Sequence, residues 1–107
     1  MGLFDYIGGK VNQMAEDVQK AQLEARHWDP EMIIRKIQVT SSMFKSQGYA
    51  QELKIRCEEM DNSQLKDTFD YAYDTRNVKA CNVMLSIMED RDLAYKDDNG
   101  RIVRRYR

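Results

Sequence analysis

Proline and glycine are scarce in this chain of 107 residues, which contains one proline and five glycines. Both residue types interrupt helices, so their scarcity favours helical structure. A chain of this length is close to the commonest size of a single domain. It buries about two-thirds of its unfolded surface, which is enough for one core without metals or disulfides. We therefore expect one mainly helical domain.

Cysteine and histidine are also few. Cys57 and Cys81 lie far apart, form no CxxC pair and suggest no disulfide framework, so we expect two reduced core thiols. Nothing in the spacing of His27, the single histidine, requires a catalytic pair with either cysteine. No P-loop, GxGxxG, HExxH or GxSxG motif occurs. These absences predict a protein that is not an enzyme, with no cofactor or metal and no identifiable small-molecule substrate.

Long apolar runs are missing too. No stretch approaches the ~20 apolar residues of a membrane span. The apolar start is interrupted by Asp5 and by Gly8 and Gly9, which argues against a secretory signal. From these absences we expect a cytoplasmic protein.

Charge is unevenly distributed along the chain. The formal net charge is −1, but residues 101–107 hold four arginines and no acid. The preceding hundred residues therefore carry 13 basic and 18 acidic side chains, a formal charge of −5. An acidic body with a basic C-terminal segment is the clearest electrostatic feature of the sequence.

Apolar side chains recur at alternating intervals of three and four residues near the N-terminus. The series is Phe4, Ile7, Val11, Met14, Val18, Ala21, Ala25 and Trp28. Such a heptad seam predicts an amphipathic helix over about residues 3–27. The seam suits packing within one bundle and packing across a homodimer equally well.

Capping residues and breakers divide the rest of the chain into four more predicted helices, over 30–46, 49–60, 62–75 and 78–95. Asp29 can cap the first of these, with Pro30 at its first position, and Gly48 is its expected stop. Asp61 opens a capping box for the helix over 62–75, and Asn77 can cap the last helix.

Two of these helices are apolar on more than one side. The helix over 78–95 has so wide an apolar arc that we place it at the centre of the core. The helix over 30–46 has two apolar faces, and one of its two neighbours could be another protein. One face consists of Ile33, Ile34, Ile37 and Phe44, and the other of Met32, Val39 and Met43.

The C-terminal end contains a turn sequence, Asp97 to Gly100, in which Asn-Gly is the preferred pair for a tight hairpin. Residues 94–96 and 101–105 are the candidate strands, and an extended tail is the alternative. The predicted fold is thus an all-α bundle of four to five helices over residues 1–96. A basic turn and tail, either extended or a β-hairpin, follows over 97–107.

The leading functional hypothesis is a protein-interaction or assembly module, because apolar helical surface exceeds what so short a chain can cover. We expect a protein partner or a homodimer. The candidate interface residues are Phe4, Ile7, Val11, Met14, Val18, Met32, Val39 and Met43. A second candidate surface is acidic, because Asp67, Asp70 and Asp74 share one face of the helix over 62–75. That face could dock a basic partner or the arginine-rich tail of the same chain.

Nucleic-acid binding is the first alternative. The tail interleaves arginine with aromatic and apolar residues, as phosphate contact and base stacking require. Its candidate contacts are Arg101, Arg104, Arg105, Tyr106 and Arg107. A helix followed by an Asn-Gly hairpin resembles the helix and wing of winged-helix DNA-binding domains, which implies base reading by the helix over 78–95. The acids Glu89, Asp90 and Asp92 on that helix argue against this function, because they repel phosphate.

Peripheral membrane attachment is the second alternative. The opening residues, GLFD, resemble short membrane-active amphipathic peptides, which implies an N-terminal segment lying in the lipid interface. Residues 1–28 hold only three basic residues against four acidic ones, so anionic lipid offers little attraction.

Overall fold

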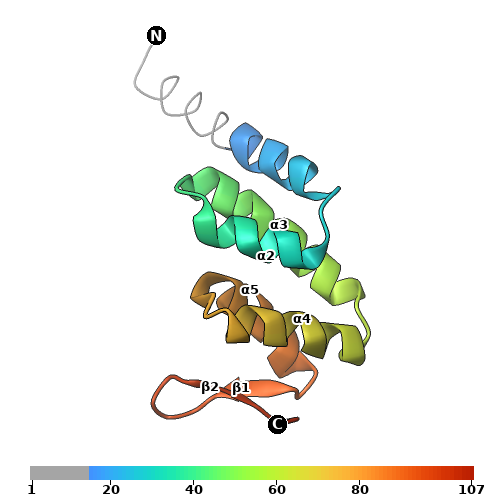
Figure 1. Ribbon diagram of the computed structural model, residues 1–107, viewed down its shortest axis with the longest axis vertical. Coiled ribbons are helices and arrows are strands. Elements are labelled where there is room, and N and C mark those ends of the chain that lie inside the picture. The colour runs from blue at the N-terminus through green and yellow to red at the C-terminus, as the bar shows by residue number, and fades with distance from the viewer. Residues whose placement is uncertain (1–14) are drawn as a thin grey trace, which may run out of the picture.

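The computed structural model describes residues 15–107, and within them the helices are stacked in tiers (Figure 1). Helical residues 15–25 form the first tier. The next two tiers are helix pairs, α2 (Pro30–Val39) with α3 (Met43–Glu59) and α4 (Asn62–Asp74) with α5 (Val78–Asp90). A two-stranded antiparallel hairpin, β1 (Ala94–Lys96) and β2 (Ile102–Arg104), closes the opposite end. The predicted all-α bundle with a C-terminal hairpin is confirmed.

The predicted helix caps are present. The Asp29 carboxylate accepts the backbone N–H of Met32 at 2.7 Å, and Pro30 occupies the first position of α2. Asp61 and Gln64 form the reciprocal capping box of α4. These caps satisfy backbone donors that have no partner inside a helix, which is why the helices begin at these residues.

The predicted helix over 30–46 is wrong, because the chain leaves the helix at Thr40 and α3 begins at Met43. The hydroxyl groups of Thr40 and Ser42 explain the break, since short hydroxyl side chains compete for backbone hydrogen bonds. The Thr40 Oγ1 accepts the N–H of Ser42 at 3.3 Å, and the Ser42 Oγ caps α3 by accepting the N–H of Lys45 at 3.2 Å. Phe44 therefore belongs to α3 and is only half-buried, rather than sharing a face with the isoleucines of α2.

Gly48 lies in the middle of α3 and does not stop a helix. A Cβ atom at this position would lie 2.6 Å from the Cβ of Ala21 and 2.9 Å from the backbone N of Gln22, and closer still to the carbonyl oxygen of Val18. Only glycine allows the first tier to approach α3 so closely. Ala21 and Ala25, on the predicted seam, are correspondingly buried.

The predicted C-terminal end of the last helix is also wrong, since α5 ends at Asp90 and not near residue 95. Asp92 adopts a left-handed backbone conformation (φ 57°), and Ala94 is already in β1. The Arg91 guanidinium, just after α5, donates to the carbonyl oxygens of Met60 at 2.7 Å and Glu58 at 3.1 Å. It thereby satisfies acceptors that the end of α3 leaves unpaired.

The hairpin pairs Tyr95 with Val103, and its turn is organised by Asp97. The Asp97 carboxylate accepts the backbone N–H groups of Asn99 and Arg101, both at 2.9 Å. Gly100 has φ 77°, a conformation that side-chain-bearing residues rarely adopt. The predicted turn sequence therefore produces a hairpin rather than an extended tail.

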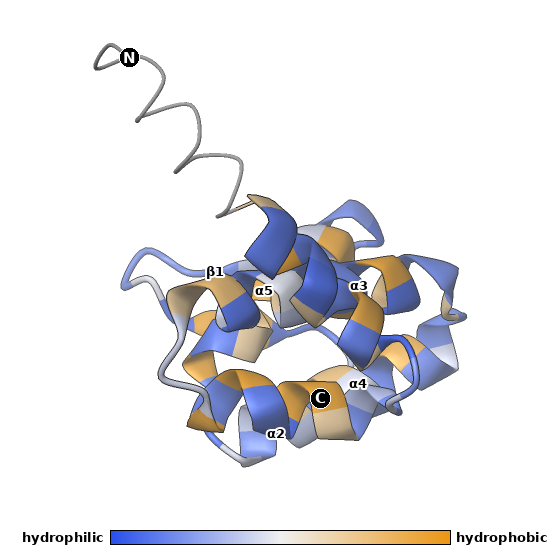
Figure 2. Ribbon diagram, turned by 90° about the horizontal axis from the view of Figure 1, so that it is seen from above, coloured by the Kyte–Doolittle hydropathy of each residue, from blue (hydrophilic) through white to orange (hydrophobic). Residues whose placement is uncertain are grey.

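The core is centred on α5, as its wide apolar arc predicts. This helix packs against α2, α3, α4 and β1. Hydrophobic and hydrophilic residues alternate along the helices, as expected when each has one buried face (Figure 2). The largest fully buried side chains come from α2, α3, α4 and α5: Ile33, Ile34, Ile37, Leu53, Cys57, Leu65, Phe69, Met84 and Met88.

Glu52 is the one buried carboxylate among the described residues, with 4% of its surface exposed. Arg56, four residues later, donates Nε to the carboxylate at 3.1 Å. Arg56 also donates to the carbonyl oxygen of Arg26, so the pair lies where α3 meets the end of the first tier.

Candidate protein-interaction site

The three most exposed large apolar side chains of the described residues are Val39, Met43 and Val78, with 75%, 82% and 69% of their surfaces exposed. Val39 ends α2, Met43 begins α3 and Val78 begins α5. These helix ends lie along one side of the stack, which is on the left in Figure 1. We call the surface formed by these three residues the open edge.

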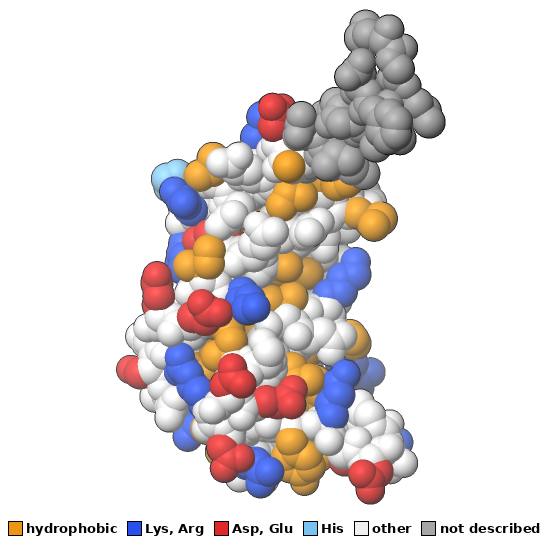
Figure 3. Space-filling view, turned by 180° about the vertical axis from the view of Figure 1, so that it is seen from behind, with side chains coloured by type: hydrophobic (Ala, Val, Ile, Leu, Met, Phe, Trp, Pro, Cys, Tyr) orange, Lys and Arg blue, Asp and Glu red, His pale blue; other side chains and the backbone are white. Residues whose placement is uncertain are grey.

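Two shallow depressions meet at Met43 on this edge. One, of about 580 Å³, lies between the first tier and α3 and is bordered by Val18 and Phe44. The other, of about 360 Å³, lies between the α2–α3 connection and α5 and is bordered by Thr40 and Lys79. Seen from behind, apolar side chains emerge among polar ones on this part of the surface (Figure 3).

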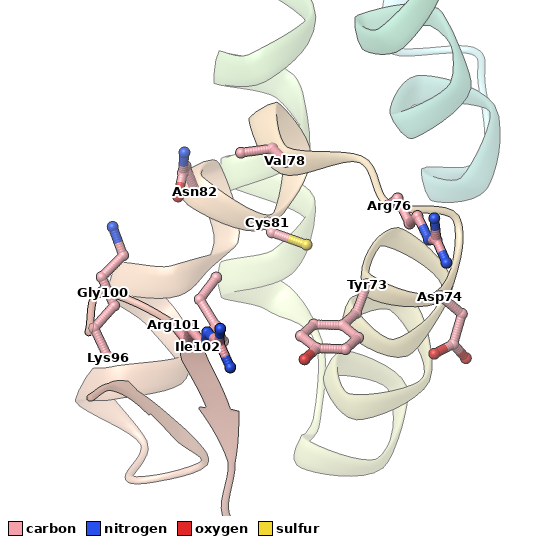
Figure 4. Close-up of a pocket in the computed structure, with 10 residues that line it drawn as sticks. All are labelled: Tyr73, Asp74, Arg76, Val78, Cys81, Asn82, Lys96, Gly100, Arg101 and Ile102. Atoms are coloured by element: carbon pink, nitrogen blue, oxygen red, sulfur yellow. The ribbon is translucent and has the colours of Figure 1, made fainter. Parts of the chain in front are cut away.

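A third depression, of about 680 Å³, continues beyond Val78 toward the hairpin. We call it the hairpin groove, bordered by Tyr73 and Arg76 at the end of α4, Val78 in α5, and Lys96 and Arg101 in the hairpin. The thiol of Cys81 and the side chain of Arg101 point into the space between the two walls (Figure 4). Since Val78 belongs to both the open edge and the groove, the two surfaces are continuous.

The candidate interface residues are placed unevenly by the structure. Val39 and Met43 are exposed on the open edge, Val18 is half-buried in the neighbouring depression, and Met32 is half-buried on α2. Phe4, Ile7, Val11 and Met14 lie outside the described residues. Val39 and Met43 were expected on one face of one helix, but they flank the break between two helices.

The acidic face of α4 receives the C-terminal segment through Asp70. The Oδ1 of this carboxylate accepts from Arg104 at 2.8 Å and from the Tyr106 hydroxyl at 2.7 Å, and its Oδ2 accepts from Arg107 at 3.4 Å. Burial raises the pKa of Tyr106, and so does the hydrogen bond to Asp70. Asp74 lies 3.7 Å from Arg104, whereas Asp67 is exposed.

The remaining residues of the tail either contact other parts of the chain or border the hairpin groove. Arg105 lies 3.1 Å from Asp92 and covers the ring of Tyr95, with 4.6 Å from its guanidinium carbon to the ring centroid. Arg104 likewise covers the ring of Tyr73 at 4.0 Å. Arg101 alone among the tail arginines borders the hairpin groove. Most of the basic tail is thus used in contacts with the same chain.

The two cysteines are free thiols inside the core. Burial raises the pKa of Cys57 to about 12 and that of Cys81 to about 11. At neutral pH neither is a thiolate, which is the reactive form. His27 is exposed where the first tier ends. Residues 15–107 contain no group of three or more histidine, cysteine or carboxylate side chains arranged to hold a metal ion.

The sequence patterns do not single out Tyr73, Arg76, Val78 or Lys96. Tyr73 and Val78 are both exposed. The starts of their helices are predicted correctly, but the groove exists only because the hairpin folds back beside the α4–α5 connection. No local signal brings residues from the end of α4 next to residues of the hairpin.

No protein-family model, curated protein or solved structure matches this chain. None of the helices described is both long enough and apolar enough to cross a membrane. Any function must therefore be inferred from the surface itself.

Proposed function

We propose that this protein is a non-enzymatic interaction module that binds another protein, or a second copy of itself, through the open edge. The observation that carries the proposal is the exposure of Val39, Met43 and Val78 along one side of the stack. Complete burial of one exposed valine or methionine side chain stabilises a complex by roughly 1.5–3 kcal/mol. Apolar side chains exposed beside shallow depressions are a feature that surfaces for protein binding share.

Packing elsewhere supports this choice of surface. The tiers bury the large apolar side chains of α2, α3, α4 and α5 within one subunit, so those faces offer nothing to a partner. The open edge is different, because its apolar residues lie at helix ends, beyond the reach of the neighbouring tiers. A partner that covers Met43 would also reach the two depressions that meet there.

Nucleic-acid binding through the tail has weaker support. Arg104, Tyr106 and Arg107 are held on Asp70, and Arg105 is paired with Asp92. Binding phosphate would require breaking these contacts. Membrane attachment concerns the N-terminal segment, which lies outside the described residues.

The proposal is tested with the double variant Val39→Ser/Met43→Ser. The matched control is Leu23→Ser/Ile55→Ser, which also replaces two exposed apolar residues, but ones that border neither the hairpin groove nor the two depressions at Met43. Sedimentation analysis of the purified chain measures self-association. Crosslinking in the native cell, followed by quantitative mass spectrometry, measures binding to other proteins.

We expect the wild type and the control to form the same complex and the open-edge variant to lose it. The variant should remain folded, because both residues are exposed. Equal loss in the control, or an unchanged complex in the open-edge variant, would rule out this surface.

A further inference from the structure

The hairpin groove has an excess of positive charge in an otherwise acidic molecule. Arg76, Lys96 and Arg101 border it, and within residues 15–107 none of these three forms an ion pair. The groove's one bordering acid, Asp74, lies 3.7 Å from Arg104 and is therefore partly neutralised. This contrasts with the rest of the tail, where Arg104, Arg105 and Arg107 all have carboxylate partners.

The three cations lie at the margins of an apolar floor. Arg76 follows α4 on one wall, and on the other wall Lys96 ends β1 and Arg101 immediately precedes β2. Of the three, Arg101 points into the space between the walls (Figure 4). Between them lie Val78, which is mostly exposed, and the half-buried Ile102. A ligand that fits this arrangement has an apolar group between negative charges.

The walls of the groove are held in place by contacts that do not involve the charged side chains of Arg76, Lys96 and Arg101. The ring of Tyr73 is covered by Arg104, which Asp70 fixes at 2.8 Å. The backbone N–H of Arg101 is fixed by the Asp97 carboxylate. A site whose walls are already ordered loses less conformational entropy when it binds a ligand.

Resting on the proposed function, we infer that the hairpin groove recognises an acidic segment of the partner protein, with an apolar anchor residue between its carboxylates. The anchor packs on Val78 and Ile102, and the carboxylates face Arg76, Lys96 and Arg101. The volume of about 680 Å³ is in the range of sites that enclose a few side chains. Continuity with the open edge at Val78 allows one partner to occupy both surfaces.

The observations favour an acidic peptide over a nucleic acid. A nucleic acid needs a long basic track, because its phosphates are closely and regularly spaced. Here the groove offers three cations, Arg76, Lys96 and Arg101, and the acid Asp74 also borders it. The ring of Tyr73, the only aromatic residue bordering the groove, is already covered by Arg104.

The test uses a random-peptide display library selected on the immobilised full-length chain. Enriched peptides are synthesised with a fluorescent label, and their affinities are measured by anisotropy at low and moderate salt. The groove variant is Arg76→Glu/Arg101→Glu. The control, Arg26→Glu/Lys54→Glu, changes the net charge equally at exposed positions that border no depression. Circular dichroism confirms that both variants are folded.

We expect enriched peptides to contain acids flanking an apolar residue. The groove variant should bind them roughly tenfold more weakly, and the control within about twofold of the wild type. Binding should weaken as salt is added. A labelled oligothymidylate is the competing probe.

Four results would each overturn the inference: no enriched peptide, enriched peptides without acids, equal weakening in the control, or oligothymidylate binding that the groove variant abolishes. Failure here is distinguishable from failure of the proposed function. If Val39→Ser/Met43→Ser loses the complex and Arg76→Glu/Arg101→Glu keeps it, the open edge remains supported as the interaction surface. The hairpin groove is then excluded as a binding site.

Discussion

At the scale of single residues, Gly48 and Asp70 are the positions where a substitution should matter most, because each is in contact with an element distant in sequence. Neither role follows from local sequence. The glycine resembles a helix stop, and Asp70 is one of three similar acids on the same face.

Replacing Gly48 with alanine should destabilise the chain. Alanine in a helix is normally favoured over glycine by about 1 kcal/mol. Here the added Cβ would overlap the backbone of the first tier, and such overpacking costs about 1–3 kcal/mol. We expect a net loss in urea unfolding, with Gln47→Ala, at an exposed neighbouring position, close to neutral. A more stable Gly48→Ala chain would contradict the close helix contact.

Replacing Asp70 with asparagine should weaken the attachment of the C-terminal segment. The change removes the charge that Arg104, Tyr106 and Arg107 share. Hydrogen bonds to charged groups contribute about 1.5–3 kcal/mol, so a loss of about 1–3 kcal/mol is expected in urea unfolding. Asp67→Asn, on the exposed part of the same helix face, serves as the control. Equal effects of the two changes would show that the segment is not held by Asp70.

At the scale of secondary-structure elements, hydrogen bonds from residues at helix ends connect neighbouring helices. Asn77 is the clearest example, because it is buried and has two functions at once. Its Oδ1 accepts the N–H of Ala80 at 3.1 Å and so caps α5, while its Nδ2 donates to the carbonyl oxygen of Ile34 in α2 at 2.7 Å.

Substitutions of Asn77 should separate these two functions. Asn77→Ala removes both hydrogen bonds and should cost about 2–3 kcal/mol in chemical denaturation. Asn77→Ser keeps an acceptor for the cap but loses the donor to Ile34, so an intermediate loss is expected. Asn82→Ala, at an exposed position one turn later, should change stability little. If the serine variant were as unstable as the alanine variant, the cap would contribute nothing measurable.

Many of the helix boundaries could be predicted from sequence, whereas the end of α5 depends on contacts between distant residues. The caps at Asp29, Asp61 and Asn77 were predicted because their signals are local. The end of α5 was predicted too late because its apolar pattern continues through Leu93 and Ala94. Tertiary contacts determine where α5 ends, since the Leu93 carbonyl accepts the N–H of Arg105 from the hairpin.

At the scale of the whole molecule, the buried thiols make stability depend on pH. Burial raises the pKa of Cys57 from 9.0 to about 12 and that of Cys81 to about 11. The folded chain therefore retains these protons at pH values where the unfolded chain releases them. This contribution to stability is complete below pH 9 and is lost as pH rises toward the folded-state values.

We expect the urea midpoint of unfolding to fall between about pH 9 and pH 11. In the double variant Cys57→Ala/Cys81→Ala, the urea midpoint should fall less steeply with pH, whatever the absolute stability of the variant. Some decline should remain, because burial also raises the pKa of Tyr49 and Tyr106. Identical slopes in the variant and the wild type would contradict thiol burial as the source.

The candidate site was predictable only in part, because it depends on how the whole chain folds. Val39 and Met43 were singled out from apolar spacing, although the argument placed them on one continuous helix. The hairpin groove was not predicted, because its walls come from segments that only the folded chain brings together. The acidic face of α4 was recognised as a docking surface, and the structure shows Asp70 on it in contact with the chain's own tail.

Arg91 links two corners of the molecule mechanically. Its guanidinium holds the carbonyl oxygens at the end of α3 and the side chain of Asn62 at the start of α4, while its backbone begins the path into the hairpin. We therefore expect a ligand that shifts the base of the hairpin to displace the α3–α4 corner as well. If the proposed groove site is correct, spectroscopic labels at that corner should report its occupancy without touching it.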